Sequence, residues 1–184
     1  RFTFISLDIP PKRPHGTAWQ YALDATAPAI QEFTHVLRRA AFRVARRETS
    51  MTPDDTEKVA QDIVGSLTTE HIEIVARLFD VVESVRYATE DSGDPHLPIG
   101  TAQVVDVVEL FLTRARLEGG TSSDYWQYMD WAASVKLVPL FESDVLGPEQ
   151  LSKLAQSLPA PFNNLMKREL LVIAASGMHF VPEA

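Results

Sequence analysis

The chain has 184 residues, of which 45% are hydrophobic and 23% are charged, and its formal net charge is −8. This length and balance are typical of a single soluble globular domain and exclude a disordered chain. The absence of cysteine excludes disulfides, thiolate metal sites and cysteine nucleophiles, and it leaves the compartment open, with a slight preference for the cytoplasm.

The beginning of the chain differs from the rest. Residues 2–9, FTFISLDI, predict a short strand, because they are rich in β-branched and aromatic residues and their apolar residues alternate. Three prolines between residues 10 and 14 exclude a helix and favour an extended arm. We therefore expect an N-terminal arm over residues 1–16 and a single helical domain over residues 17–184. A strand without a partner leaves backbone groups unpaired, so we expect the arm to pair with another chain or to lie over the domain.

After the arm, helix signals follow one another at short intervals. Capping residues, early-turn prolines and terminal glycines mark these boundaries. The predicted helices begin near Pro28, Pro53, Thr68, Thr101, Thr121 and Pro148, and a last one follows Pro161 and ends at Gly177. In the third, a 3–4–3 spacing defines one apolar face, made of Ile72, Val75, Phe79 and Val82. The sequence predicts an all-α fold, an irregular bundle of about six to seven helices with a short extended or β N-terminal arm.

The two ends of the chain allow further expectations. The late uncharged run over residues 170–182 has 13 residues, which is too short to span a bilayer, so we expect no transmembrane segment. Residue 1 is arginine rather than methionine, so we expect an excised domain or a processed product. A cleaved signal peptide is compatible with this start.

Residues 38–47, RRAAFRVARR, place five arginines in ten positions of an acidic chain. Residues 12–47 carry seven basic and two acidic residues (net +5), whereas residues 48–184 carry nine basic and 22 acidic ones (net −13). At about 100° per residue, the five arginines share one half of the predicted helix. This arginine face consists of Arg38, Arg39, Arg43, Arg46 and Arg47. Phe42 and Val36 fall inside the basic half, which suggests contact with another molecule, while the opposite half is apolar.

Three interpretations of the arginine face stay open. It could be a solvated surface whose late arginines complement the helix dipole. It could bind carboxylates of a partner or of another copy, since the segment over residues 90–94 is acidic. It could bind phosphates, although the acidic remainder of the chain opposes a nucleic acid. We expect replacement of Arg39, Arg43 and Arg46 by glutamate to preserve the fold, because none lies on the apolar stripe.

An aromatic segment, residues 125–131, forms the second candidate surface. Its five aromatic or Met side chains cannot all face one direction of a helix, so this helix is either central or docked to a partner. Trp126 and Trp131 lie about 140° apart, and we expect one to be core and one to contact a partner or ligand.

Motifs for catalysis and metal binding are sparse. Glu32 and His35 form one Glu-x-x-His step, but a di-iron bundle requires two. Residues 70–73, EHIE, read as an exposed helix start, and residues 91–96 lack the regular oxygen spacing of a calcium loop. Residues 149–170 have the rhythm of a helix-turn-helix. However, residues 148–184 carry three basic and three acidic residues, and a packed helical hairpin fits equally well. We name no catalytic residue, metal ligand or cofactor.

The sequence therefore favours a non-enzymatic interaction or assembly domain that uses the arginine face and the aromatic helix. The predicted partner-binding residues are Arg38, Arg39, Phe42, Arg43, Arg46, Arg47, Trp126 and Trp131. A protein partner or self-association is expected. A nucleic-acid-binding domain using the same arginines is the first alternative, and a helical small-ligand-binding protein or enzyme is the second.

Overall fold

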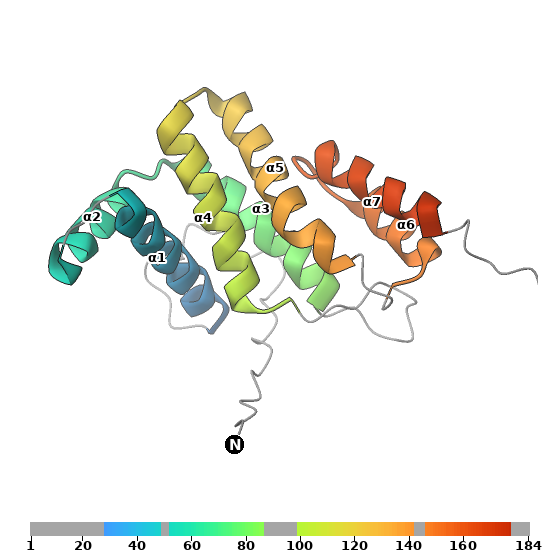
Figure 1. Ribbon diagram of the computed structural model, residues 1–184, viewed down its shortest axis with the longest axis horizontal. Helices are drawn as coiled ribbons and strands as arrows, with labels where there is room; N and C mark the ends of the chain where they lie inside the picture. Colours follow the sequence, from blue (N-terminus) through green and yellow to red (C-terminus); the bar gives the residue numbers. More distant parts are fainter. Residues whose placement is uncertain (1–27, 49–51, 87–98, 142–145, 178–184) are drawn as a thin grey trace, which may run out of the picture.

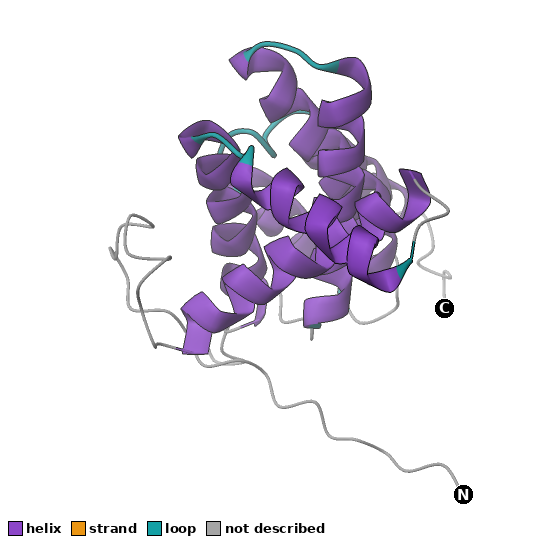
Figure 2. Cartoon of the chain, turned by 90° about the vertical axis from the view of Figure 1, so that its left-hand side faces the viewer, coloured by secondary structure: helices purple, strands orange, loops and turns teal. Residues whose placement is uncertain are grey.

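The computed structural model describes residues 28–48, 52–86, 99–141 and 146–177. These residues form seven helices and, within those ranges, no strand (Figure 2). The helices are α1 (Pro28–Glu48), α2 (Pro53–Gly65), α3 (Thr69–Arg86), α4 (Thr101–Glu118), α5 (Ser122–Phe141), α6 (Pro148–Ser157) and α7 (Leu165–Gly177). The predicted all-α bundle is confirmed. The predicted arm over residues 1–16, its strand and the acidic segment at residues 90–94 lie outside the described residues.

The helices pack as a series of neighbours. α1 packs against α2 and α4, α4 against α5, α5 against α3 and α7, and α6 against α7. Figure 1 shows this order across the molecule, with α2 at one end and the α6–α7 pair at the other. One hydrophobic core runs through the bundle, and its largest aromatic members are Phe79, Phe111, Phe141 and Phe162. None of the helices in the described part of the chain is long and apolar enough to cross a membrane.

Local capping chemistry sets the helix boundaries, as the sequence predicts. Thr52 precedes α2, and its hydroxyl oxygen accepts a hydrogen bond from the Asp55 N–H at 3.3 Å. α4 ends at Gly119, whose φ of 63° is a left-handed conformation that a side chain would disfavour. At the start of α5, the Asp124 carboxylate accepts a hydrogen bond from the Thr121 N–H at 2.8 Å, which lowers the pKa of Asp124.

A buried ion pair joins α1, α3 and the start of α4. The Arg86 guanidinium donates to both carboxylate oxygens of Glu32, each at 3.0 Å, and to the Ile99 carbonyl. The Thr101 hydroxyl adds a hydrogen bond to Glu32 at 2.7 Å. The Arg86 side chain is 0% exposed and that of Glu32 is 8% exposed. The Glu-x-x-His step is therefore no metal site, because Glu32 is engaged by cation and hydroxyl donors while His35 is exposed.

The α5–α7 contact contains a tertiary helix cap. Asp130, which is buried on α5, accepts hydrogen bonds from the Leu165 N–H at 2.6 Å and the Met166 N–H at 3.0 Å. Burial raises the pKa of Asp130, and the two N–H donors partly oppose that rise. The carboxylate satisfies donors that the first turn of α7 would otherwise leave unpaired. In a DNA-binding helix-turn-helix, the first turn of the second helix faces DNA. Here the first turn of α7 faces the Asp130 carboxylate, so the structure favours a packed hairpin for α6 and α7.

Candidate functional site

The arginine face of α1 is divided by its packing against α4. Arg43 forms an ion pair with Asp106, and its guanidinium also lies 3.3 Å from a Glu109 oxygen. The Arg47 guanidinium lies 2.7 Å from the other Glu109 oxygen. Hydrogen bonding to Asp106 raises the pKa of Arg43, with a further contribution from Glu109 and an opposing one from desolvation. Carboxylates of this chain's own α4 thus neutralise part of the arginine face.

Glu109 is the most buried member of this ion-pair group, with a side chain 6% exposed. The contact between Arg47 and Glu109 has the distance of an ion pair but not the angle of a hydrogen bond, so this oxygen accepts no hydrogen bond within the described residues. Arg43, Arg46, Arg47 and Glu109 line a shallow surface hollow of about 350 Å³. The Glu109 carboxylate neutralises part of the positive charge that the three arginines bring to this hollow.

The remaining three arginines are directed to solvent. Arg38, Arg39 and Arg46 are exposed, and no carboxylate of the described residues forms an ion pair with them. They are called the unpaired arginines below. Arg46 lies in the last turn of α1, where a cation also complements the helix dipole. These three side chains can reach a second molecule without first breaking an ion pair with the described part of the chain.

The sequence expectation that Val36 contacts another molecule is wrong, while the partner-binding role of Phe42 stays a prediction. Val36, which lies in the basic half of the helix, is fully buried, and Phe42 is half-buried and packs against the core. The reason is that α1 contacts both α2 and α4, so its buried arc is wider than a single stripe. Because Arg43 bonds to α4, its replacement by glutamate would also bring a third carboxylate against Asp106 and Glu109. We therefore now expect Arg43→Glu to destabilise the fold.

The aromatic residues of α5 are half-buried against the core. Both Trp126 and Trp131 have this intermediate exposure, so neither is a fully buried core residue. The Arg114 guanidinium of α4 lies 4.7 Å from the Tyr128 ring centroid and 4.8 Å from that of Trp131. These are cation–π distances, and they give Trp131 an intramolecular partner. Arg114 also bonds to Glu118 at 3.1 Å, an i,i+4 pair that its spacing in the sequence could have indicated.

His71 of α3 packs against Tyr125, the first residue of the aromatic segment. Its ring centroid lies 4.4 Å from that of Tyr125 and 6.0 Å from that of Phe111. Its Nδ1 accepts a hydrogen bond from the Thr68 N–H at 3.3 Å. Burial lowers the pKa of His71, and nearby Glu70 opposes this only in part. The interpretation of residues 70–73 as an exposed helix start is therefore wrong for His71, which is half-buried.

The two predicted surfaces are separate in the structure. α4 packs between α1, which carries the arginine face, and α5, which carries Trp126 and Trp131 (Figure 1). The structure therefore brings three of the five arginines together around Glu109 but does not join either tryptophan to them. Sequence reasoning missed Asp106 and Glu109, although their i,i+3 spacing on a predicted helix marks one acidic face.

The described residues contain no group of three His, Cys, Asp or Glu side chains placed to hold a metal ion. Comparison of the chain with known protein families, with curated proteins and with solved structures finds no significant match.

Proposed function

We propose that this chain is a non-enzymatic helical interaction domain that binds an acidic protein surface through the unpaired arginines of α1. The observation that supports this is the contrast within one helix face. Arg43 and Arg47 are held by carboxylates of α4, while Arg38, Arg39 and Arg46 are exposed without such partners. Exposed ion pairs add little to folding stability, about 0 to 1 kcal/mol each, so stability alone does not explain three unpaired cations.

Arginine suits this role because its planar guanidinium can form two hydrogen bonds to one carboxylate. The acidic residues Asp106 and Glu109 lie beside the arginines and would repel anionic groups that extend past the exposed guanidiniums, so a compact acidic patch on a protein is favoured over an extended phosphate backbone. The net charge of −8 would further repel an extended polyanion beyond the contact. Nucleic-acid binding through the same residues remains the alternative. Trp126 and Trp131 would form a second, separate contact on the other side of α4.

A charge-reversal experiment tests the proposal. The variant carries Arg39→Glu and Arg46→Glu and leaves Arg43 in place, because Arg43 supports the fold. The control carries Lys58→Glu and Arg77→Glu, which are exposed positions on α2 and α3 and produce the same change in charge. Binding of a short fluorescent glutamate peptide and of a labelled DNA duplex is measured by anisotropy over a salt series, with circular dichroism as the fold control.

We expect the wild type and the control to bind the short glutamate peptide more tightly than the duplex, and we expect salt to weaken that binding. The α1 variant should bind at least tenfold more weakly while keeping its helical signal. Equal loss of binding in the α1 variant and the control would contradict a specific role for these arginines. Preference of the wild type for the duplex, lost in the α1 variant, would establish the nucleic-acid alternative instead.

A further inference from the structure

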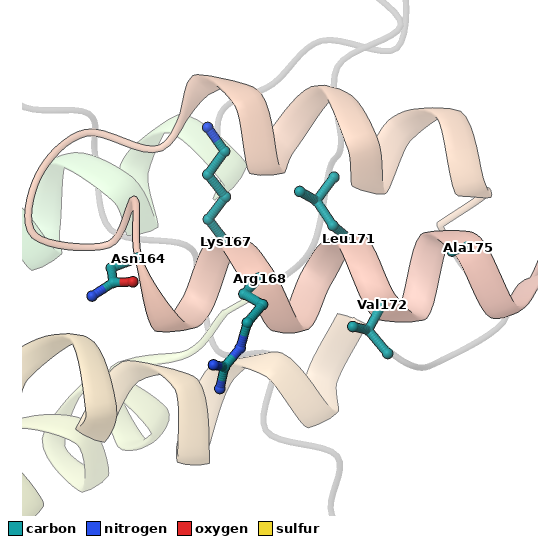
Figure 3. Close-up of a pocket in the computed structure, with 6 residues that line it drawn as sticks. All are labelled: Asn164, Lys167, Arg168, Leu171, Val172 and Ala175. Atoms are coloured by element: carbon teal, nitrogen blue, oxygen red, sulfur yellow. The ribbon is translucent and has the colours of Figure 1, made fainter.

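α7 presents an outward face that the bundle does not use. Asn164, Arg168, Leu171 and Ala175 recur at i, i+4, i+7 and i+11, so they lie in line along the helix, and Lys167 and Val172 flank them. Val172 is 63% exposed and Leu171 is 38% exposed. The six side chains line a shallow hollow of about 380 Å³ (Figure 3). They are called the α7 face below.

The opposite side of α7 already supplies the packing of this helix. Met166, Leu170 and Ala174 are buried, and α7 contacts α5 and α6. Among the described residues, no other segment of the chain covers Leu171 and Val172. Leu171 and Val172 form a small exposed apolar patch that polar side chains border, and a second molecule could bury it.

The chemistry of the α7 face changes along the helix. Its N-terminal end carries two long cations, Lys167 and Arg168, and its C-terminal end carries the small residue Ala175. Arg168 lies 3.8 Å from Glu169 in an exposed ion pair, which holds it only weakly. The last turn of α7 contains no basic residue, so no side chain of its own compensates the partial negative charge of its terminal carbonyl groups.

We propose that α7 pairs in antiparallel orientation with α7 of a second copy of this chain. Centring the pair between Leu171 and Val172 places each Leu171 opposite Val172 of the other copy. Arg168 then lies opposite Ala175, where the small side chain leaves room for the guanidinium. The same arrangement brings the two cations of each helix to the negatively polarised end of the other. Arg168 thus meets the small residue Ala175, and the basic end of each helix meets the negatively polarised end of the other. This self-complementarity is what a closed two-fold interface requires.

This dimer contact does not involve the arginine face of α1. The two contacts can be told apart because high salt should weaken binding by the arginine face but not the α7 dimer. The α7 contact is centred on apolar side chains, and screening of the repulsion between two chains of charge −8 favours association. The contact should therefore persist at about 0.5 M salt, where the Debye length is below about 8 Å and contacts between exposed charges weaken. Failure of one of the two proposals leaves the other untouched.

Sedimentation of the full chain at about 0.5 M salt, over a concentration series reaching about 1 mM, tests the pairing. We expect the average mass of the wild type to rise from monomer toward dimer. Val172→Glu should weaken dimerisation at least tenfold. The matched control is Leu117→Glu, an exposed leucine on α4 that is 77% exposed, and it should dimerise like the wild type. A wild type that stays monomeric throughout overturns the proposal, and so does equal loss in the two variants.

Single cysteines test the orientation, since the natural chain contains none. In the antiparallel pair, position 172 of one copy lies next to position 172 of the other. Position 164 lies 15 residues from its counterpart, about 22 Å along the axis. A disulfide needs Cα atoms within about 7 Å. Val172→Cys should therefore form a covalent dimer under mild oxidation much faster than Asn164→Cys or the collision control Leu117→Cys. Equal rates at positions 164 and 172 would contradict the antiparallel pair.

Discussion

The buried contact between Arg86 and Glu32 gives the sharpest test of how this bundle is held together. Arg86→Ala removes the three guanidinium hydrogen bonds to Glu32 and Ile99, and it leaves the Glu32 carboxylate inside the protein with the Thr101 hydroxyl as its remaining donor among the described residues. This substitution should be severe because Glu32 lies inside the protein. The Arg86 side chain is 0% exposed and the Glu32 side chain is 8% exposed, so neither can turn to solvent. An ionised carboxylate in such a place must either stay unpaired or take up a proton, and both outcomes favour the unfolded chain.

The expected magnitude follows from this burial. Removing one partner of a buried ion pair costs about 3 to 5 kcal/mol in the free energy of unfolding. For a domain of this size each kcal/mol lowers the melting temperature by about 2 to 4 °C, so Arg86→Ala should lower it by about 6 to 20 °C. Replacing both partners by apolar residues, Arg86→Met with Glu32→Leu, should restore much of that loss, since two buried charges are then removed together. Arg77→Ala on the same helix, at an exposed arginine, should change stability by less than about 0.5 kcal/mol.

Urea unfolding of the wild type, the single variants Arg86→Met and Glu32→Leu, and the double variant that combines them measures the coupling between Arg86 and Glu32. Circular dichroism reports the unfolding of the helices, and equal denaturant slopes would show that the same surface is exposed in each case. The reasoning is refuted if the effects of the two single variants simply add in the double variant. It is also refuted if Arg86→Ala costs no more than the exposed control Arg77→Ala.

Two further predictions concern α5 and α3. Asp130→Ala should cost about 1 to 3 kcal/mol in urea unfolding, because it removes the acceptor of two N–H groups at the start of α7. Asp130→Asn should cost less, since it keeps a carbonyl acceptor without a buried charge, and a larger loss for asparagine than for alanine would contradict this account. The lowered pKa of His71 means that the folded state resists protonation. Stability should therefore be complete above the unfolded pKa near 6.5 and should fall as the pH drops from there through the folded pKa. Urea unfolding at pH 7.5 and pH 5 should show a smaller loss for His71→Phe than for the wild type, and an identical loss would refute the assignment.

The boundaries of the described helices follow from the sequence because the signals that set them are local. Thr52 with Asp55, Gly119 and Thr121 with Asp124 each act within a few residues, so their meaning does not depend on where distant parts of the chain lie. The position of the arginines on one half of α1 follows in the same way from the helical repeat. The all-α class was predictable for this reason.

Which of these side chains are covered was decided by contacts between residues far apart in the chain. Arg43 and Asp106 are separated by 63 residues, and their pairing divides an arginine face that looks uniform in the sequence. Val36 is buried because α1 has neighbours on more than one side, which a single helix cannot reveal. The burial of Arg86 could have been predicted from the sequence. Arg86 continues the 3–4 spacing of the apolar residues of α3 and so lies on the buried face of that helix. Its partner Glu32, 54 residues away, could be found only after the helices had packed. Helical periodicity places a charge on a face, but the tertiary structure determines what that face meets and whether the charge is neutralised.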